Sequence, residues 1–237
     1  MFAAKGFAVL DVELVPFYGF KPGDFESFLW AYYAPLADFE AAIKTVVDMG
    51  VVDPSRKGIS GLSYGARLTS FAISHSDLFQ AAIVSGPNGD DPFFYYLDDP
   101  FQMKAGFGPS GLEWPEGETS KKWHRLSPAL NAARVKAPLL VNSADSELLA
   151  GMQFYTSLLQ LGKAIEVFIY PDEEHEKNQP KHRYEIYQRN VDWFDFWLNG
   201  HEDTDSAKAD QYKRWRTLRK MQQDNESKLA TSQNASH

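Results

Sequence analysis

Residues 56–68 read RKGISGLSYGARL, with one serine, Ser63, held between two glycines. The residues before the glycines predict a short strand, and the apolar spacing after them predicts a helix. Where the pattern G-x-S-x-G joins a strand to a helix, the serine lies in a strained turn, and its neighbours at Gly61 and Gly65 must be small. The stretch predicts one of two structures: an ordinary glycine turn, or a turn that presents Ser63 as a nucleophile.

Strands and helices alternate along most of the chain. β-Branched and aromatic runs bounded by turn residues predict strands, and apolar residues at helical spacing predict helices. The expected strands are 7–14, 57–60, 81–85, 138–142 and 166–170, and the expected helices are 35–49, 64–76, 147–161 and 180–198. This alternation predicts an α/β fold with a doubly wound, mostly parallel sheet and helices on both faces.

A nucleophilic serine requires an acid and a histidine, and in this kind of turn they follow the serine in that order, after later strands. Asp145 follows the fourth expected strand, in SADSE, and His175 follows the fifth, in PDEEHEK. His175 would be the general base toward Ser63, and Asp145 would orient its imidazole. The Tyr64 backbone N–H would face the developing oxyanion. Because three unrelated turns rarely produce this order, the nucleophile interpretation is favoured over the plain glycine turn.

Other charged residues near these positions have simpler interpretations. Glu147 is expected to open a helix as a favourable N-terminal acid. Three glutamates around His175 are expected to be solvated loop charges: Glu173, Glu174 and Glu176. The segment HEKNQ resembles the start of a zinc-protease helix, but the next histidine, His182, lies seven residues on rather than four. The sequence therefore predicts neither a metal site nor a cofactor.

The composition limits the classes of partner and compartment. Of the 237 residues, 43% are hydrophobic and 14% aromatic, which is enough to build a sizeable core. The net charge of -8 argues against a nucleic-acid surface, and no stretch reaches the ~20 apolar residues that a membrane span needs. The absence of cysteine excludes disulfides and thiolate chemistry and leaves the compartment open. The N-terminus does not read as a signal peptide, because Asp11 and Glu13 interrupt its apolar run.

Two regions depart from the alternation. Residues 87–128 form a Gly- and Pro-rich insertion. Its aromatic residues are Phe93, Phe94, Tyr95, Tyr96, Phe101, Phe107, Trp114 and Trp123. The insertion either lines a substrate pocket or forms a satellite cluster that pins a long loop, and both readings stay open. Residues 201–237 predict a charged surface helix to about residue 223 and then a disordered end, after a catalytic domain over 1–200.

The motifs GLSYGA, NSADSE and YPDEEH, with the segment KGFAVLDVELVPFYGF, resemble the catalytic domain of the prolyl oligopeptidase family over about residues 5–200. The resemblance implies an α/β-hydrolase fold and a serine peptidase whose triad is Ser63, Asp145 and His175. Family members normally carry an N-terminal β-propeller, and their sheet begins with strands that this sequence lacks. The resemblance therefore implies a fragment of a larger enzyme, without the second oxyanion donor that the missing part would supply.

The segment HEKNQPKHRYEIYQRNVDWFDFWLNG and the charged tail are similar to the C-terminal part of lasso-peptide isopeptidases, a bacterial subgroup of the same family. The implied function is hydrolysis of a peptide or isopeptide bond, with a peptide and in particular a lasso peptide as substrate, through an acyl-enzyme on Ser63. Two alternatives stay open: an esterase-type serine hydrolase, and a truncated domain that acts as a non-catalytic binding module.

Overall fold

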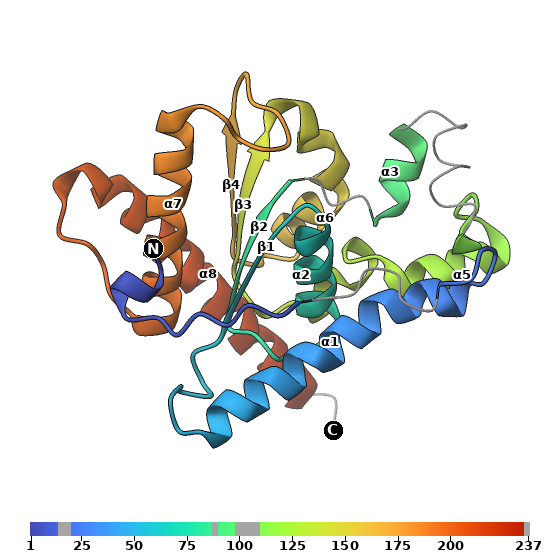
Figure 1. Ribbon diagram of the computed structural model, residues 1–237, viewed down its shortest axis with the longest axis horizontal. Coiled ribbons are helices and arrows are strands. Elements are labelled where there is room, and N and C mark those ends of the chain that lie inside the picture. Colours follow the sequence, from blue (N-terminus) through green and yellow to red (C-terminus); the bar gives the residue numbers. More distant parts are fainter. Residues whose placement is uncertain (14–19, 87–89, 98–109, 235–237) are drawn as a thin grey trace.

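The fold is built on four parallel strands, visible at the centre of Figure 1. The structure, a computed structural model, describes residues 1–13, 20–86, 90–97 and 110–234. The strands are β1 (Gly58–Leu62), β2 (Ala81–Ser85), β3 (Leu139–Ala144) and β4 (Ile165–Tyr170), in the order β1-β2-β3-β4. Every neighbouring pair is parallel, which confirms the predicted sheet. These four strands each lie within two residues of their expected bounds.

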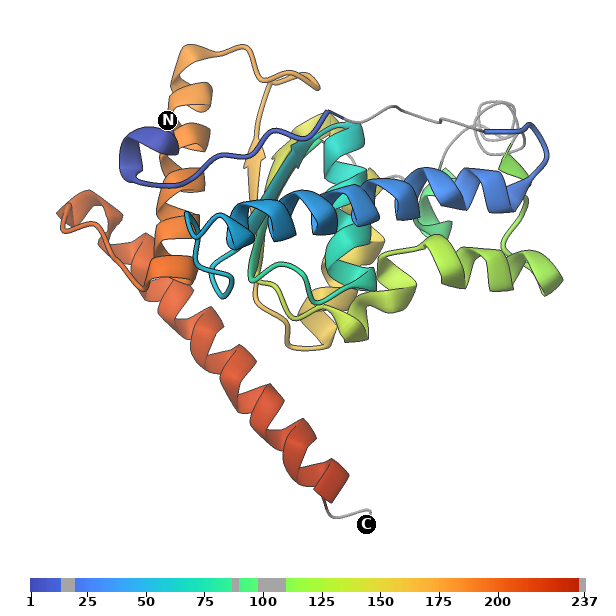
Figure 2. The ribbon, with the colours of Figure 1, turned by 60° about the horizontal axis from the view of Figure 1, so that its bottom comes forward.

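Helices connect the strands, because parallel neighbours need a crossover connection. The longer helices are α1 (Phe25–Asp48), α2 (Tyr64–His75), α3 (Pro92–Leu97), α5 (Gly117–Leu126), α6 (Leu148–Gln160), α7 (Pro180–Phe194) and α8 (Ala209–Asn234). The short helical turns are η1 (Ala3–Lys5), η3 (Ala129–Arg134), η4 (Asp145–Glu147), η5 (Asp195–Asn199) and η6 (Ser206–Lys208). Figure 2 shows α1 crossing in front of α2, and α8 leading away from the end of α7.

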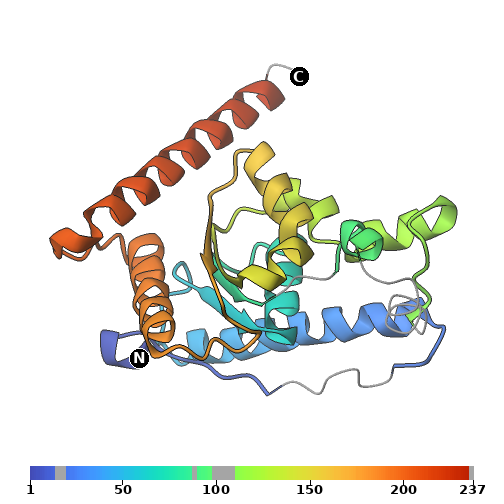
Figure 3. The same cartoon turned by 90° about the horizontal axis from the view of Figure 1, so that it is seen from above.

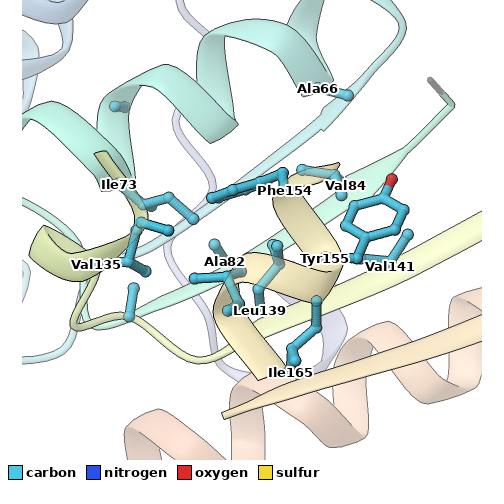
Figure 4. Packing of buried hydrophobic residues seen from close by; sticks show 14 of the residues in the cluster. Ala66, Ile73, Ala82, Val84, Val135, Leu139, Val141, Phe154, Tyr155 and Ile165 are labelled. Atoms are coloured by element: carbon cyan, nitrogen blue, oxygen red, sulfur yellow. The ribbon is translucent and has the colours of Figure 1, made fainter. Parts of the chain in front are cut away.

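The sheet is covered by apolar helices on both faces, as the alternation predicts. On one face Val84 of β2 and Phe154 of α6 belong to a core cluster that also includes residues of α2, and Figure 4 shows how they interdigitate. On the other face Leu140 of β3 packs in a cluster with Trp193 of α7 and Trp215 of α8. Figure 3 shows α7 on one side of the strands and α2 with α6 on the other.

A further apolar layer covers the outer side of α2. Phe28 and Tyr32 of α1 pack with Leu68 and Phe71 of α2 and with Trp123 of α5. Because its opposite side faces the sheet, α2 is enclosed between two apolar layers, and eight of its twelve residues are buried. The helix that follows Ser63 is thus an interior element of the fold.

Residues 7–13 do not form a strand, which corrects the expectation for 7–14; Leu14 lies outside the described residues. Val9 and Leu10 are 61% and 47% exposed. In the described part of the chain, β1 is the edge of the sheet, and no strand pairs with its outer side. An apolar, β-branched run becomes a strand only where another strand supplies ladder hydrogen bonds, and here the described residues supply none to 7–13.

Two helices are longer than the sequence indicates. α1 begins at Phe25, ten residues before the expected start, because the Asp24 carboxylate caps it by accepting from the backbone N–H of Glu26 at 3.0 Å. α8 continues to Asn234 rather than ending near residue 223. Residues 235–237, which belong to the expected disordered end, lie outside the described residues.

Candidate active site

Ser63 occupies the turn between β1 and α2 with a backbone conformation that is rare for a side-chain-bearing residue. Its φ is 59° and its ψ is -119°, in a region that stores strain. Backbone hydrogen bonds hold it there: Ser63 N–H donates to the Ser85 carbonyl at 3.0 Å, and the Ser63 carbonyl accepts from Ala66 and Arg67 N–H at 2.9 and 3.2 Å. The strained turn that the glycine pattern predicts is therefore present at the carboxyl end of the sheet.

Only one of the two flanking glycines is required by close contact. A Cβ on Gly61 would lie 2.2 Å from both the carbonyl carbon and the oxygen of Gly65. Both are backbone atoms, so they cannot move without shifting the turn. A Cβ on Gly65 would meet nothing within 4 Å. The strand and the helix approach each other at Gly61, so the expectation that both positions must be small holds for Gly61 and is corrected for Gly65.

Tyr64 is the first residue of α2, so its backbone N–H belongs to the positive N-terminal end of a helix. Its phenol donates to the Ala31 carbonyl of α1 at 3.0 Å, which ties the start of α2 to the outer layer. The role of the Tyr64 N–H as oxyanion donor stays a prediction, consistent with this position.

His175 lies in the loop between β4 and α7 and approaches Ser63 at Gly86. A Cβ on Gly86 would lie 2.9 Å from His175 Cε1, 3.4 Å from its Nδ1 and 3.4 Å from the backbone nitrogen of Ser63. Both residues therefore converge on this glycine, whose φ of 94° also favours the absence of a side chain. Within the described ranges no hydrogen bond joins Ser63 Oγ to the ring, and such bonds often tighten only when substrate is bound.

The carboxylate that contacts His175 is that of Glu147 and not that of Asp145. His175 Nδ1 lies 2.5 Å from Glu147 Oε1. Asp145 instead accepts from the backbone N–H of Ser146 at 2.9 Å and of Asp172 at 3.2 Å. The expected pairing of Asp145 with His175 is therefore not the one that the structure shows.

The reason is a short helical turn. β3 continues to Ala144, and η4 then carries the chain through Asp145 to Glu147, so that Glu147 faces the loop of His175. The sequence predicts Glu147 at the start of a helix, and Glu147 is indeed the N-cap residue of α6, but its contact with His175 was not expected. The one available signal was its position two residues after Asp145 in SADSE.

Glu147 is an ionised carboxylate held by two donors. Burial acts to raise its pKa, but hydrogen bonds from His175 and Lys177, and then their charges, outweigh burial and leave the pKa below its usual value of 4.5. Lys177 Nζ donates to Oε2 at 3.1 Å. One oxygen of the Glu147 carboxylate thus binds the imidazole of His175, and the other binds the ammonium group of Lys177.

An ion-pair network joins the helix of Ser63 to the segment after β2. Arg67 Nε donates to both carboxylate oxygens of Asp90, at 2.9 and 3.0 Å, and Arg67 Nη2 donates to the Tyr32 phenol at 2.8 Å. The Tyr32 hydroxyl donates in turn to Asp90 at 3.0 Å. Since Asp90 is fully buried, this network fixes the first turn of α2 against α1 and the start of the insertion.

Asp91 is a buried acid with an incomplete set of partners. One carboxylate oxygen accepts from Ser127 Oγ at 2.5 Å and from Ala129 N–H at 2.9 Å, whereas the other has no hydrogen-bond partner among the described residues. Burial raises the pKa of Asp91 to about 7, against the lowering effect of these two hydrogen bonds. The folded protein therefore keeps a proton on Asp91 at pH values where the unfolded chain has lost it.

We expect Asp91→Asn to become more stable relative to the original chain as pH rises. Between the unfolded pKa of 3.8 and the folded pKa of about 7, the folded state binds more protons, so Asp91 lowers the free energy of unfolding progressively over that range. The full effect is roughly 4 kcal/mol. Urea unfolding of both proteins at pH 5 and pH 8 checks this, and a stability difference that does not change with pH would contradict it.

The insertion contributes both a cluster and a cavity. Trp123 is fully buried, and Phe94 packs against the same cluster on α1 and α2. A cavity of about 400 Å³ between α3 and α6 includes Phe93, and its other lining residues are Pro92, Met152, Gln153 and Thr156. The side chains of Tyr95 and Tyr96, together with Phe101 and Phe107, lie outside the described part. For Trp123 and Phe94 the structure supports the satellite-cluster reading, whereas Phe93 lines a cavity.

In the described ranges, no three His, Asp or Glu side chains come together as a metal ion would need. Among the helices of the same ranges, none combines the length and apolar character of a bilayer-crossing segment.

A parallel sheet flanked by helices, with a strained serine between strand and helix and a histidine in the loop after a later strand, defines the α/β-hydrolase class. Within this class the chain belongs to the prolyl oligopeptidase family, whose model matches residues 29–201.

Several known proteins are similar to the chain. The lasso peptide isopeptidase AtxE2 of Asticcacaulis excentricus is 39% identical over 174 residues, which make up 73% of this chain and 25% of that protein. An acylamino-acid-releasing enzyme of Arabidopsis thaliana is 27% identical over 65% of this chain and 21% of its own length. The chain thus spans about a quarter of the length of these relatives.

Solved structures of such peptidases are also similar to the chain. The AtxE2 isopeptidase without ligand superposes with a TM-score of 0.75 and 37% identity, over 81% of this chain and 30% of that one. AtxE2 with Astexin3-dC4 bound gives a TM-score of 0.74. An acylaminoacyl peptidase of Pyrococcus horikoshii gives 0.59 at 25% identity, over 73% of this chain and 29% of its own.

Proposed function

We propose that this chain carries the nucleophile, base and acid of a serine peptidase that hydrolyses a peptide or isopeptide bond through an acyl-enzyme on Ser63. The observation that carries the proposal is the convergence of the strained Ser63 and of His175, itself bonded to a carboxylate, on Gly86. Family membership supports the same class of reaction.

The residues take these roles in the proposed reaction. Because Glu147 binds Nδ1, the Nε2 atom of His175 is the one that takes the proton from Ser63 Oγ. The Oγ atom attacks the carbonyl carbon, and the Tyr64 N–H stabilises the resulting oxyanion. His175 then gives the proton to the leaving amine, so the amide bond breaks and the acyl-enzyme remains. Water, deprotonated by His175, releases the acid and restores Ser63.

Glu147 replaces Asp145 as the orienting acid in this proposal. Its hydrogen bond to Nδ1 fixes the tautomer that leaves Nε2 free to accept a proton, and its negative charge stabilises the imidazolium that forms. Asp145 keeps a structural role, since its carboxylate fastens the end of β3 to the backbone of Asp172 at the start of the His175 loop.

The substrate class is proposed from the similarity to AtxE2, a protein named as a lasso peptide isopeptidase. An isopeptide bond is an amide formed by an Asp or Glu side chain, so the same acyl transfer applies. The proposed test incubates the chain with a threaded lasso peptide, with a linear peptide of the same composition and with a simple ester. Gain of one water by the lasso peptide alone supports the isopeptidase assignment, and faster ester cleavage favours the esterase alternative.

We expect a fluorophosphonate probe to label the purified chain and to leave Ser63→Ala unlabelled. The Ser63 Oγ displaces fluoride from phosphorus, a reaction that requires an activated serine. Labelling is read by intact-protein mass, with circular dichroism to show that both proteins are folded. A folded wild-type chain that takes up no probe would contradict the peptidase proposal and favour the non-catalytic binding module.

A further inference from the structure

One ammonium group ties together the two residues that activate Ser63 in the proposed function. Lys177 Nζ donates to Glu147 Oε2 at 3.1 Å and to the backbone carbonyl of His175 at 3.1 Å. Glu147 Oε1 lies 2.5 Å from His175 Nδ1, so the three groups close a ring of contacts. The same lysine therefore holds the acid and the backbone of the base.

Lys177 is buried, unlike most lysines. Its side chain is 4% exposed, that of Glu147 is 12% exposed, and that of His175 is 43% exposed. A buried ammonium is strongly unfavourable unless paired, and breaking such a pair leaves an uncompensated charge. Lys177 is thus held where it lies by its pairing with Glu147.

The loop that carries Lys177 is fixed independently of this pair. The Glu173 carboxylate, 2% exposed, accepts from the N–H groups of Asn178 at 2.7 Å and Gln179 at 3.1 Å, and lies 2.7 Å from His182 Nδ1. Glu173 thereby closes the loop across its base, at the start of α7. Glu173 is therefore not the solvated loop charge that the sequence predicts. Glu174 and Glu176 are exposed, as expected.

We propose that Lys177 is a positioning residue of the proposed peptidase: it holds the Glu147 carboxylate in place and ionised, and through Glu147 it sets the orientation of the His175 ring. The proposal rests on the proposed function for the identity of the reaction, and on the contacts above for the role of the lysine.

Few other charges act on Glu147. Within the described residues, His175 and Lys177 are the groups that lower its pKa. Tyr155 of α6 also lies near, since burial and then the charges of Asp91 and Glu147 raise the pKa of its phenol. Asp145, on the same turn, is engaged with backbone N–H groups. Loss of the Lys177 charge therefore removes both a hydrogen-bond donor and a positive charge that lower the pKa of Glu147, so this pKa should rise.

The test compares Lys177→Met and Lys177→Gln with the charge-preserving Lys177→Arg and with Lys181→Met. Lys181 is a matched control, because it lies four residues away with an 83% exposed side chain. Titration of the Glu147 carboxyl carbon by NMR, assigned with Glu147→Gln, should show a rise of about one pH unit in both neutral variants. Lys177→Arg and Lys181→Met should stay within a few tenths of the original protein.

The same variants are tested for the rate of fluorophosphonate labelling as a function of pH. Loss of the Lys177 charge favours protonation of the coupled Glu147–His175 pair, so the acid limb of the profile should move to higher pH, by up to about one unit, in the neutral variants. An unmoved limb, or an equal movement in Lys181→Met, would overturn the proposal. Two neutral variants are used so that the test survives if one of them fails to fold.

The proposed peptidase function and the proposed role of Lys177 can be refuted independently of each other. A folded wild-type chain without labelling removes the peptidase proposal, while the NMR titration still decides whether Lys177 controls Glu147. Normal labelling of the wild type, together with an unchanged Glu147 titration in Lys177→Met and Lys177→Gln, removes the role of Lys177 alone.

Discussion

We expect Glu147→Gln to slow the labelling of Ser63 by about 10³- to 10⁴-fold, with the fold intact. The amide has nearly the shape of the carboxylate, so packing is preserved. It carries no charge to stabilise the imidazolium, and its NH₂ group can donate toward Nδ1, which would favour the wrong tautomer of His175. The second-order rate constant of labelling at pH 8, with circular dichroism of both proteins, measures the effect.

Asp145→Asn is the matched control, since both carboxylates lie on the same turn. It should leave the labelling rate within about threefold, because the Asp145 oxygens bind only the backbone N–H groups of Ser146 and Asp172. The reverse result, with labelling lost in Asp145→Asn and kept in Glu147→Gln, would restore Asp145 to the role that the sequence predicts for it.

Gly61→Ala should lower the free energy of unfolding by about 3 kcal/mol and abolish labelling. The new methyl group would lie 2.2 Å from the Gly65 carbonyl, and neither backbone can move without displacing Ser63 from its strained turn. Urea unfolding at pH 7 measures the stability, and the probe measures whether Ser63 is still presented.

Gly65→Ala serves as the comparison for Gly61→Ala. Its methyl group would project into open space, and alanine is favoured over glycine in a helix by about 1 kcal/mol. This variant should be as stable as the original chain or slightly more so. Equal destabilisation by the two substitutions would show that the close approach at Gly61 does not control the turn.

The sheet and its helices could be predicted because their signals are local. The run AAIVS lies between turn residues and forms β2 with the expected bounds, and the pattern from Tyr64 onward forms α2 almost residue for residue. By contrast, FAVLDVEL carries the same local signal, yet residues 7–13 form no strand, because hydrogen bonds to a neighbour are a property of the assembled sheet.

The sequence predicts which segments form the candidate site, but not every residue that takes part in it. That Ser63 and His175 lie near each other could be predicted, because G-x-S-x-G and the order of later strand ends restrict the choice strongly; their catalytic roles stay predictions. The carboxylate that contacts His175 could not be predicted, because β3 ends two residues later than expected and η4 then brings Glu147, rather than Asp145, to His175. Lys177 carried no signal in the sequence, where it reads as one more charge in a charged loop.

The enclosure of α2 between two apolar layers gives the two halves of the candidate site different local stability. Opening the Ser63 turn requires separating α2 from the sheet and from α1 at once, so this part belongs to the cooperative unit that opens last. The loop of His175 is half-exposed and fastened mainly through polar contacts of Glu173 and Lys177, so it can open by itself. Partial unfolding would therefore displace His175 first and leave Ser63 in its turn.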